Sequence, residues 1–272
     1  MEDPYYPDMA DIIETSQEAW TLALEQFNLA VTLRTYPVGV PSLLSSEGTL
    51  LNPLGEVIFY EIPSISSIIG IWILFSLLGL VVGSLFFNEV SRLSDDKRRT
   101  FSLENTVWQI IQILGLTISI YLMLVIISIP LSLIVSLFVV VNAFLAQAAL
   151  FCISLLFIWF LLPLIFSPHG IFERHDNFLV SLVTSAKIVR HTLPGTGMFI
   201  FVLLLLSQGM DYLWQIPPET SWLKFVGISG HAFVSTSLLA ASFIYYRKGI
   251  TWMEEKQEKL KSLQHQPPEK QA

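Results

Sequence analysis

The longest apolar stretch of the chain covers residues 105–172 and contains no Asp, Glu, Lys or Arg. Within it, residues 107–166 are almost continuously apolar, with interruptions at Pro130, Asn142 and Gln147. The hydrocarbon core of a bilayer accommodates about 20 apolar residues per helix, whereas a soluble domain does not bury so long an apolar run in one piece. We therefore interpret this stretch as lipid-embedded sequence.

The charges on either side of this stretch decide how often it crosses the bilayer. At about 1.5 Å per residue, a single straight helix of this length would cover roughly three bilayer cores, so the chain must fold back. Basic residues occur on both sides, at 92–99 and at 174–190. Because basic loops stay cytoplasmic, both flanks lie on one side and the stretch crosses twice. We place the turn at 142–147; the alternative is a turn at Pro130.

Three further segments are apolar enough and long enough to span a bilayer. The sequence therefore predicts an all-α, polytopic membrane bundle of about five transmembrane helices. The predicted spans are 64–87, 107–141, 146–166, 196–214 and 222–246. The first of them contains Gly79 and Gly83, four residues apart, and small residues at this spacing allow close approach of another helix. We expect that face to pack within this chain; dimerisation through it is the alternative.

Two more segments have the periodicity of amphipathic helices that lie at the membrane interface. One covers residues 8–34 and ends before Pro37; it could also bind a partner. The other covers residues 176–191, with Asp176 as the expected N-cap. The link before it, 167–176, contains Pro168 and Gly170 and is predicted to be irregular.

The composition agrees with a membrane protein, since 53% of the residues are hydrophobic and 14% are charged. The net charge of −7 is uneven, because residues 1–64 carry ten acidic residues and one basic residue, Arg34. With basic loops inside, the acidic tail 1–63 lies outside and the polar tail 248–272 is cytoplasmic. The N-terminus has no basic and apolar leader, so we expect no cleavable signal peptide. An upstream spanning helix in a longer form is an alternative route for the tail.

Two motifs carry a resemblance to known proteins. They are RTYPVGVPSL at 34–43, which leads into the glycine-containing span, and GHAFVSTSLLAASFIYYR at 230–247. Together with the interfacial helix, they resemble uncharacterised multi-pass bacterial membrane proteins. The layout is also loosely similar to the membrane domain fused to some glycerophosphodiester phosphodiesterases. The resemblance implies a bacterial inner-membrane bundle; phosphodiesterase activity is not implied, because this chain has no such domain.

His231 is the ionisable residue that lies deepest within a predicted span. Its burial costs several kcal/mol unless the ring stays neutral and hydrogen-bonded, so such residues are functional hypotheses by default. Asp211, near the outer end of the preceding span, is a conceivable partner. The alternative is a structural histidine bonded to Ser229, Ser235 or a backbone carbonyl.

A second group of chemically capable residues lies in the link before the interfacial helix. His169, Glu173, His175 and Asp176 are types that bind zinc or exchange protons. Their spacing matches no standard metal motif, so we expect no metal and no cofactor here, but a solvated loop that caps the next helix. A metal-binding or catalytic role of these residues is the alternative.

A cluster of basic residues follows the first predicted span. Lipid headgroup contacts are a possible role for Arg92, Lys97, Arg98 and Arg99. No nucleotide, metalloprotease or serine hydrolase motif is present, and nucleic-acid binding has no support. We predict a non-enzymatic scaffold or accessory subunit that contacts lipid and another membrane protein or a second copy. The alternatives are a transporter-like or small-molecule-binding bundle around His231, and an interfacial enzyme that uses the link at 167–176.

Overall fold

The structure, a computed structural model, describes residues 29–42, 64–95, 100, 102–218 and 221–264. Every regular element in these ranges is a helix, and five helices are long and apolar enough to cross a membrane. The predicted all-α, multi-pass bundle is thus confirmed. The long helices are α2 (Ile65–Leu93), α3 (Leu103–Val141), α4 (Ala143–Leu161), α7 (Leu193–Gln215) and α8 (Leu223–Gln264). The short ones are η1 (Leu29–Leu33), η2 (Leu162–Leu164), α5 (Ser167–Arg174) and α6 (Phe178–His191).

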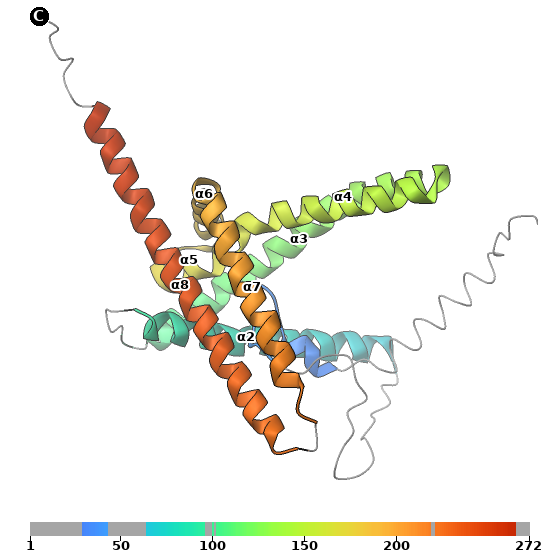
Figure 1. The fold of residues 1–272 in the computed structure, drawn as a ribbon, viewed down its shortest axis with the longest axis horizontal. Helices are drawn as coiled ribbons and strands as arrows, with labels where there is room; N and C mark the ends of the chain where they lie inside the picture. The colour runs from blue at the N-terminus through green and yellow to red at the C-terminus, as the bar shows by residue number, and fades with distance from the viewer. Residues whose placement is uncertain (1–28, 43–63, 96–99, 101, 219–220, 265–272) are drawn as a thin grey trace, which may run out of the picture.

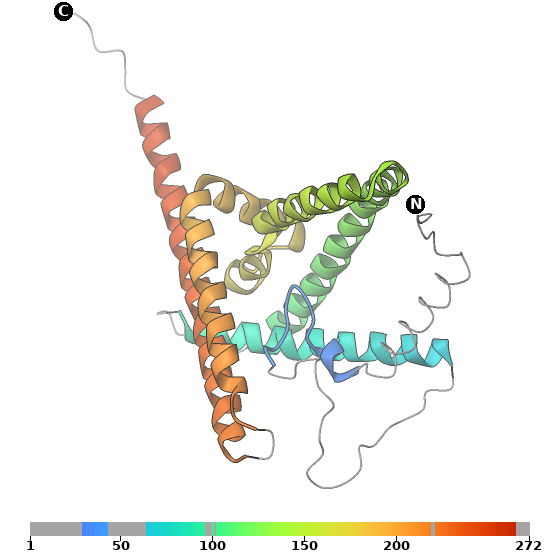
Figure 2. The same ribbon diagram turned by 45° about the vertical axis from the view of Figure 1, so that its right-hand side comes forward.

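The long helices form three arms, α2 alone, α3 with α4, and α7 with α8 (Figures 1 and 2). The arms meet around α5 and α6 and diverge from there. α5 packs against α2, α3 and α8, so it lies at the junction of all three arms.

The α3–α4 arm is a helical hairpin that reverses at Asn142. Its side chain accepts a hydrogen bond from the backbone N–H of Phe144 at 2.7 Å and caps α4. Pro130, the alternative turn position, lies inside α3. From residue 121 to residue 160 only Ala146 is buried, so this part of the hairpin presents its apolar side chains to lipid.

Residues 29–42 enter the bundle without forming a spanning helix, and we call them the inserted segment. Val38 is fully buried and belongs to the main core cluster. A Cβ at Gly83 would lie 2.8 Å from the Gly39 Cα, and one at Gly79 would overlap the Leu33 carbonyl. The two glycines of α2 therefore accommodate backbone of the same chain, namely the end of the short 3-10 helix η1 at Gly79 and the non-helical residues 38–39 at Gly83, and not another long helix.

The core lies where the arms meet, and its members come from four helices and the inserted segment. Phe87 of α2 contacts Phe172 of α5 at a ring-centroid distance of 5.8 Å and Phe243 of α8 at 6.2 Å. The cluster consists of Val38, Leu80, Val90, Ile113, Leu116, Ile120, Ile171, Phe172 and Phe243. Apolar burial is thus concentrated around α5, while the far ends of the arms contribute little.

The link at 167–176, predicted to be irregular, is instead the helix α5. Pro168 is tolerated because it lies in the first turn, where its missing N–H has no helical partner. The helix ends at His175, which has a left-handed backbone with φ of 55°. Residues 167–172 are all buried, so the expectation of a solvated loop is also wrong for this part of the link.

The helix predicted at 176–191 is α6, which begins at Phe178, and its cap is Asn177, not Asp176. The Asn177 side chain accepts from the Val180 N–H at 2.8 Å. Ser181 and Ser185 face the protein and donate to the carbonyls of Ser167 and Pro163. α6 therefore packs on α5 and η2 through its small hydroxyl residues.

The predicted amphipathic helix at 8–34 falls largely outside the described residues. Where it is described, the chain forms the 3-10 helix η1. At the other end of the chain, α8 continues without a break from the last span to Gln264. The final span and much of the predicted tail are thus one helix.

Candidate functional site

A cavity of about 390 Å³ lies between the α7–α8 arm and the inserted segment. We call it the α7–α8 cavity. Most of its wall is apolar, including Phe199, Leu203 and Leu204 of α7 and Leu238 and Leu239 of α8. Polar side chains face it at separate places along the arm: Ser207 and Asp211 on α7; His231, Ser235 and Ser242 on α8; His169 on α5; and Arg34 and Thr35 on the inserted segment.

The strongest polar contact at the cavity is between Asp211 and His231. The carboxylate Oδ1 lies 2.6 Å from Nδ1 of the imidazole, and the side chains are 23% and 7% exposed. The antiparallel pairing of α7 and α8 brings together two residues that are 20 positions apart. A carboxylate only accepts hydrogen bonds, so it holds the histidine with a proton on Nδ1. The pair thus compensates for the cost of burying polar groups among apolar helices.

Ser235 extends this contact on the other side of the imidazole ring. Its Oγ lies 3.4 Å from Nε2 of His231, one helical turn away on α8. The next two hydroxyl residues behave differently, because Thr236 and Ser237 donate to backbone carbonyls four residues earlier. Ser235 is therefore directed to a side chain, and Asp211, His231 and Ser235 form one chain of contacts at the cavity.

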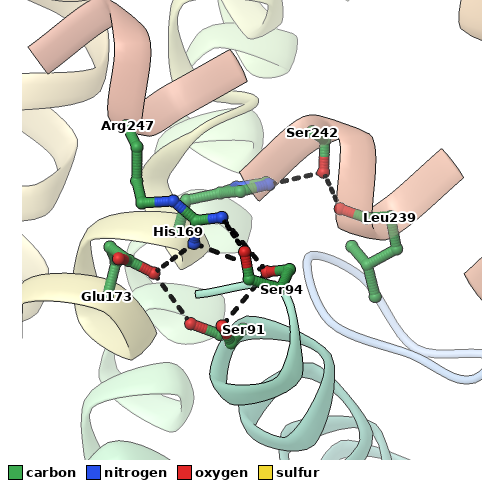
Figure 3. Close-up of polar contacts among 7 residues, drawn as sticks. All are labelled: Ser91, Ser94, His169, Glu173, Leu239, Ser242 and Arg247. Atoms are coloured by element: carbon green, nitrogen blue, oxygen red, sulfur yellow. Dashed lines mark hydrogen bonds and ion pairs between the residues drawn. The ribbon is translucent and has the colours of Figure 1, made fainter. Parts of the chain in front are cut away.

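A second histidine, His169 of α5, also lines the cavity, and Figure 3 shows it beside Ser242 and Leu239 of α8. Nε2 of His169 lies 2.8 Å from the Ser242 Oγ, and that hydroxyl donates to the Leu239 carbonyl at 2.6 Å. A hydroxyl has one hydrogen, so this arrangement makes the imidazole the donor to Ser242. His169 is 5% exposed, and its Nδ1 has no partner among the described residues.

Beside this histidine, an ion pair joins three elements (Figure 3). The Arg247 guanidinium lies 3.2 Å from Oε2 of Glu173, and the side chains are 24% and 10% exposed. The same guanidinium donates to the backbone carbonyl of Ser94, and Ser91 donates to Glu173 at 2.9 Å. This network fixes the end of α2, α5 and α8 to one another.

The four candidate residues of segment 167–176 thus have separate partners. His169 contacts Ser242 and Glu173 contacts Arg247, as described above. Nδ1 of His175 lies 3.4 Å from Nε2 of Gln109, and Asp176 pairs with Arg174 at 3.6 Å. No group of three or more His, Cys, Asp and Glu side chains suited to a metal ion occurs in the described part of the chain. The structure therefore does not gather these residues into one site.

The predicted headgroup cluster is described only in part. Arg92 pairs with Glu89 one turn earlier on α2, at 2.5 Å. Lys97, Arg98 and Arg99 fall outside the described residues. Contact of this cluster with lipid headgroups stays a prediction.

The chain matches no known protein family. Searches of the curated proteins and of the solved structures likewise find no similar protein. The resemblance drawn from residues 34–43 and 230–247 stays a prediction, and the functional argument rests on the geometry of the α7–α8 cavity.

The structure adds residues that the sequence analysis did not assign to a site. From the sequence, Ser235 is expected only as a structural partner of His231, although its spacing of four residues indicates a shared helix face. No sequence pattern indicates that Arg34 lines the cavity, because the other wall residues are far away in the chain. The pairing of Glu173 with Arg247 has no sequence signal for the same reason.

Proposed function

We propose that this protein binds an amphipathic, lipid-like molecule in the α7–α8 cavity. The proposal corresponds to the small-molecule-binding bundle around His231, which is one of the alternatives that the sequence leaves open. The observation that carries it is the Asp211–His231 pair at a cavity whose walls are otherwise mostly apolar. Binding sites for small molecules have this composition, with apolar walls for packing and a few polar groups that fix orientation.

The placement of the polar groups defines the expected ligand. Asp211 is the more exposed member of the pair and offers a carboxylate oxygen that accepts hydrogen bonds. Phe199, Leu203 and Leu204 line the cavity along the same helix, about two to three turns before Asp211. A molecule with an apolar chain along these residues and a hydrogen-bond donor in its head group fits both features.

Removal of the carboxylate tests this proposal. We expect Asp211→Asn to lower the lipid-like material that copurifies after gentle extraction by about tenfold, equivalent to about 1.4 kcal/mol for a charge-assisted hydrogen bond. Mass spectrometry of extracts from equal amounts of protein measures the bound molecules. The matched control is Ser237→Ala, since Ser237 bonds only to the Phe233 carbonyl and is not part of the cavity wall. Equal amounts in all three proteins would contradict the proposal.

We further propose that the protein lies in a bacterial inner membrane, with its N-terminus outside and its C-terminus in the cytoplasm. The support is the distribution of charge. Arg92, Arg174 and Arg247 lie near the junction of the arms, at the opposite end of α8 from Trp222. Basic residues mark the cytoplasmic side of a membrane protein.

Single cysteines in a Cys152→Ser background test this orientation. We expect a membrane-impermeant thiol reagent to label Gln215→Cys in intact cells and to label Ser262→Cys only after the cells are opened. Both native residues are exposed, at the end of α7 and near the end of α8. The reverse pattern of labelling would overturn the proposed orientation.

A scaffold or accessory role is the second candidate, and the exposed α3–α4 hairpin favours it. Between residues 121 and 160 this arm packs little against the rest of the bundle, so it is open to another membrane protein or a second copy. The purification described above also tests this role: a protein that copurifies in a fixed ratio supports it, and pure protein without such a companion counts against it.

A further inference from the structure

The Asp211, His231 and Ser235 side chains are arranged as an acid, a base and a hydroxyl in series. Oδ1 of Asp211 contacts Nδ1 of the imidazole at 2.6 Å, and Nε2 on the opposite side of the ring faces Oγ of Ser235 at 3.4 Å. The same order of contacts activates the hydroxyl in serine hydrolases of several unrelated folds, which are recognised by geometry and not by sequence order.

The hydrogen bond to Asp211 sets the direction of proton transfer. Because the carboxylate accepts a hydrogen bond from the Nδ1–H group, the neutral ring carries its lone pair on Nε2, the atom that faces Ser235. That lone pair can take the hydroxyl proton. The carboxylate then stabilises the imidazolium that forms.

The other histidine–serine pair at the same cavity lacks this arrangement. The other histidine and serine, His169 and Ser242, lie 2.8 Å apart, but the Ser242 hydroxyl donates to the Leu239 carbonyl. His169 also has no carboxylate on its Nδ1, which is unpaired in the described structure. The pair of His231 and Ser235 therefore has two features of an activated nucleophile that the second pair lacks.

The surroundings suit reaction with a lipid. All three side chains line the α7–α8 cavity, whose walls are mostly apolar, and electrostatic contacts are stronger beside apolar groups than in bulk water. The separation of 3.4 Å is longer than a strong hydrogen bond and lies within the looser range of a nucleophile and its base before substrate binds.

We propose that Ser235 is a nucleophile for acyl transfer from an ester-linked lipid, with His231 as general base and Asp211 as the residue that orients it. The inference rests on the proposed binding function for the placement of the substrate. A bond forms between Oγ of Ser235 and the acyl carbon while the bond from that carbon to the ester oxygen breaks. The hydroxyl proton passes to Nε2 of His231 and then to the leaving alcohol.

Water completes the reaction. His231 removes a proton from a water molecule, whose oxygen bonds to the acyl carbon as the bond to Ser235 breaks. The proton returns to the serine oxygen, and a carboxylic acid leaves. No oxidation or reduction occurs in either half of the reaction.

The test uses the full-length protein in detergent and a fluorophosphonate that carries a long alkyl chain. Attack by Ser235 on phosphorus displaces fluoride and leaves a stable adduct, which peptide mass spectrometry locates. We expect wild-type protein and Ser237→Ala to be labelled at Ser235 and Ser235→Ala to be unlabelled. We expect Asp211→Asn to react about 100-fold more slowly, because the base loses its orientation.

Two measurements accompany the labelling, namely the thermal unfolding midpoint of each variant and its content of copurified lipid. If the wild-type protein retains lipid but Ser235 is not labelled, acyl transfer is overturned and the binding function stands. If Ser235 is labelled but no lipid is retained, acyl transfer is supported and the binding function fails. A folded Asp211→Asn variant that is labelled at the wild-type rate would overturn the role of Asp211.

Discussion

Replacement of Arg247 by alanine is expected to destabilise the protein by about 3 kcal/mol, the magnitude for loss of one partner of a largely buried ion pair. The guanidinium joins Glu173 on α5 to the Ser94 carbonyl after α2, and the Glu173 carboxylate is only 10% exposed. Without Arg247 the carboxylate stays in its buried place and loses this cation. The free energy of unfolding in detergent measures the effect.

Arg174 provides a matched control on α5, immediately after Glu173. Its side chain is 43% exposed, and its guanidinium contacts Asp176 and Glu254 at 3.6 and 3.8 Å. Exposed pairs of this kind contribute about 0–1 kcal/mol, so Arg174→Ala should change little. Arg247→Lys should be intermediate, because an ammonium group keeps the charge but not the planar set of donors. Equal destabilisation by Arg174→Ala and Arg247→Ala would show that burial of the pair is unimportant.

The second large effect is expected for Gly83→Leu in α2. Even a Cβ at this position would lie 2.8 Å from the Gly39 Cα and 3.1 Å from the Val38 carbonyl carbon, both backbone atoms of the inserted segment. Backbone cannot move aside as a flexible side chain can, so we expect destabilisation of about 3 kcal/mol, the upper range for an overfilled core. Thermal unfolding in detergent is the measurement.

The control for this prediction is Gly70→Leu on the same helix. A Cβ at Gly70 has nothing within 4 Å, and leucine favours a helix more than glycine by about 0.5–1 kcal/mol. Gly70→Leu should therefore be neutral or stabilising. If Gly83→Leu behaved in the same way, the inserted segment would not be held against α2. Copurified lipid should also decrease in Gly83→Leu, since the inserted segment forms part of the cavity wall.

Much of the fold could be predicted because lipid imposes strict conditions on sequence. A spanning segment must be long, apolar and helical, so the five long helices are visible in the hydrophobic pattern. The position of Asn142 at the hairpin turn also has a simple cause. Its polar side chain is unfavourable within an apolar helix and favourable as a helix cap.

The inserted segment and α5 could not be predicted, because their structure depends on residues far away in the chain. Gly170 looked like a helix breaker, yet the Ser181 hydroxyl and the Tyr246 hydroxyl approach α5 so closely at this position that a side chain would overlap them. Pro168 is compatible with the helix only because α5 begins beside it. Local propensity therefore gave the wrong prediction where tertiary packing decided the conformation.

The candidate site was predictable to a similar degree. His231 and Asp211 stood out because ionisable side chains are rare in apolar helices. Their distance, and the direction in which Ser235 points, depend on how α7 and α8 are rotated about their axes. The sequence of a nearly uniform apolar helix contains little information about that rotation.

The burial of Val38 has a consequence for biosynthesis. This residue shares its core cluster with Ile113, Ile171 and Phe243, which the ribosome adds much later. The N-terminal inserted segment therefore cannot reach its final environment when it is made, and it must wait until nearly the whole chain has been translated. Contacts of such long sequence separation form slowly. The contacts of the inserted segment are thus completed last, after α8 has entered the membrane.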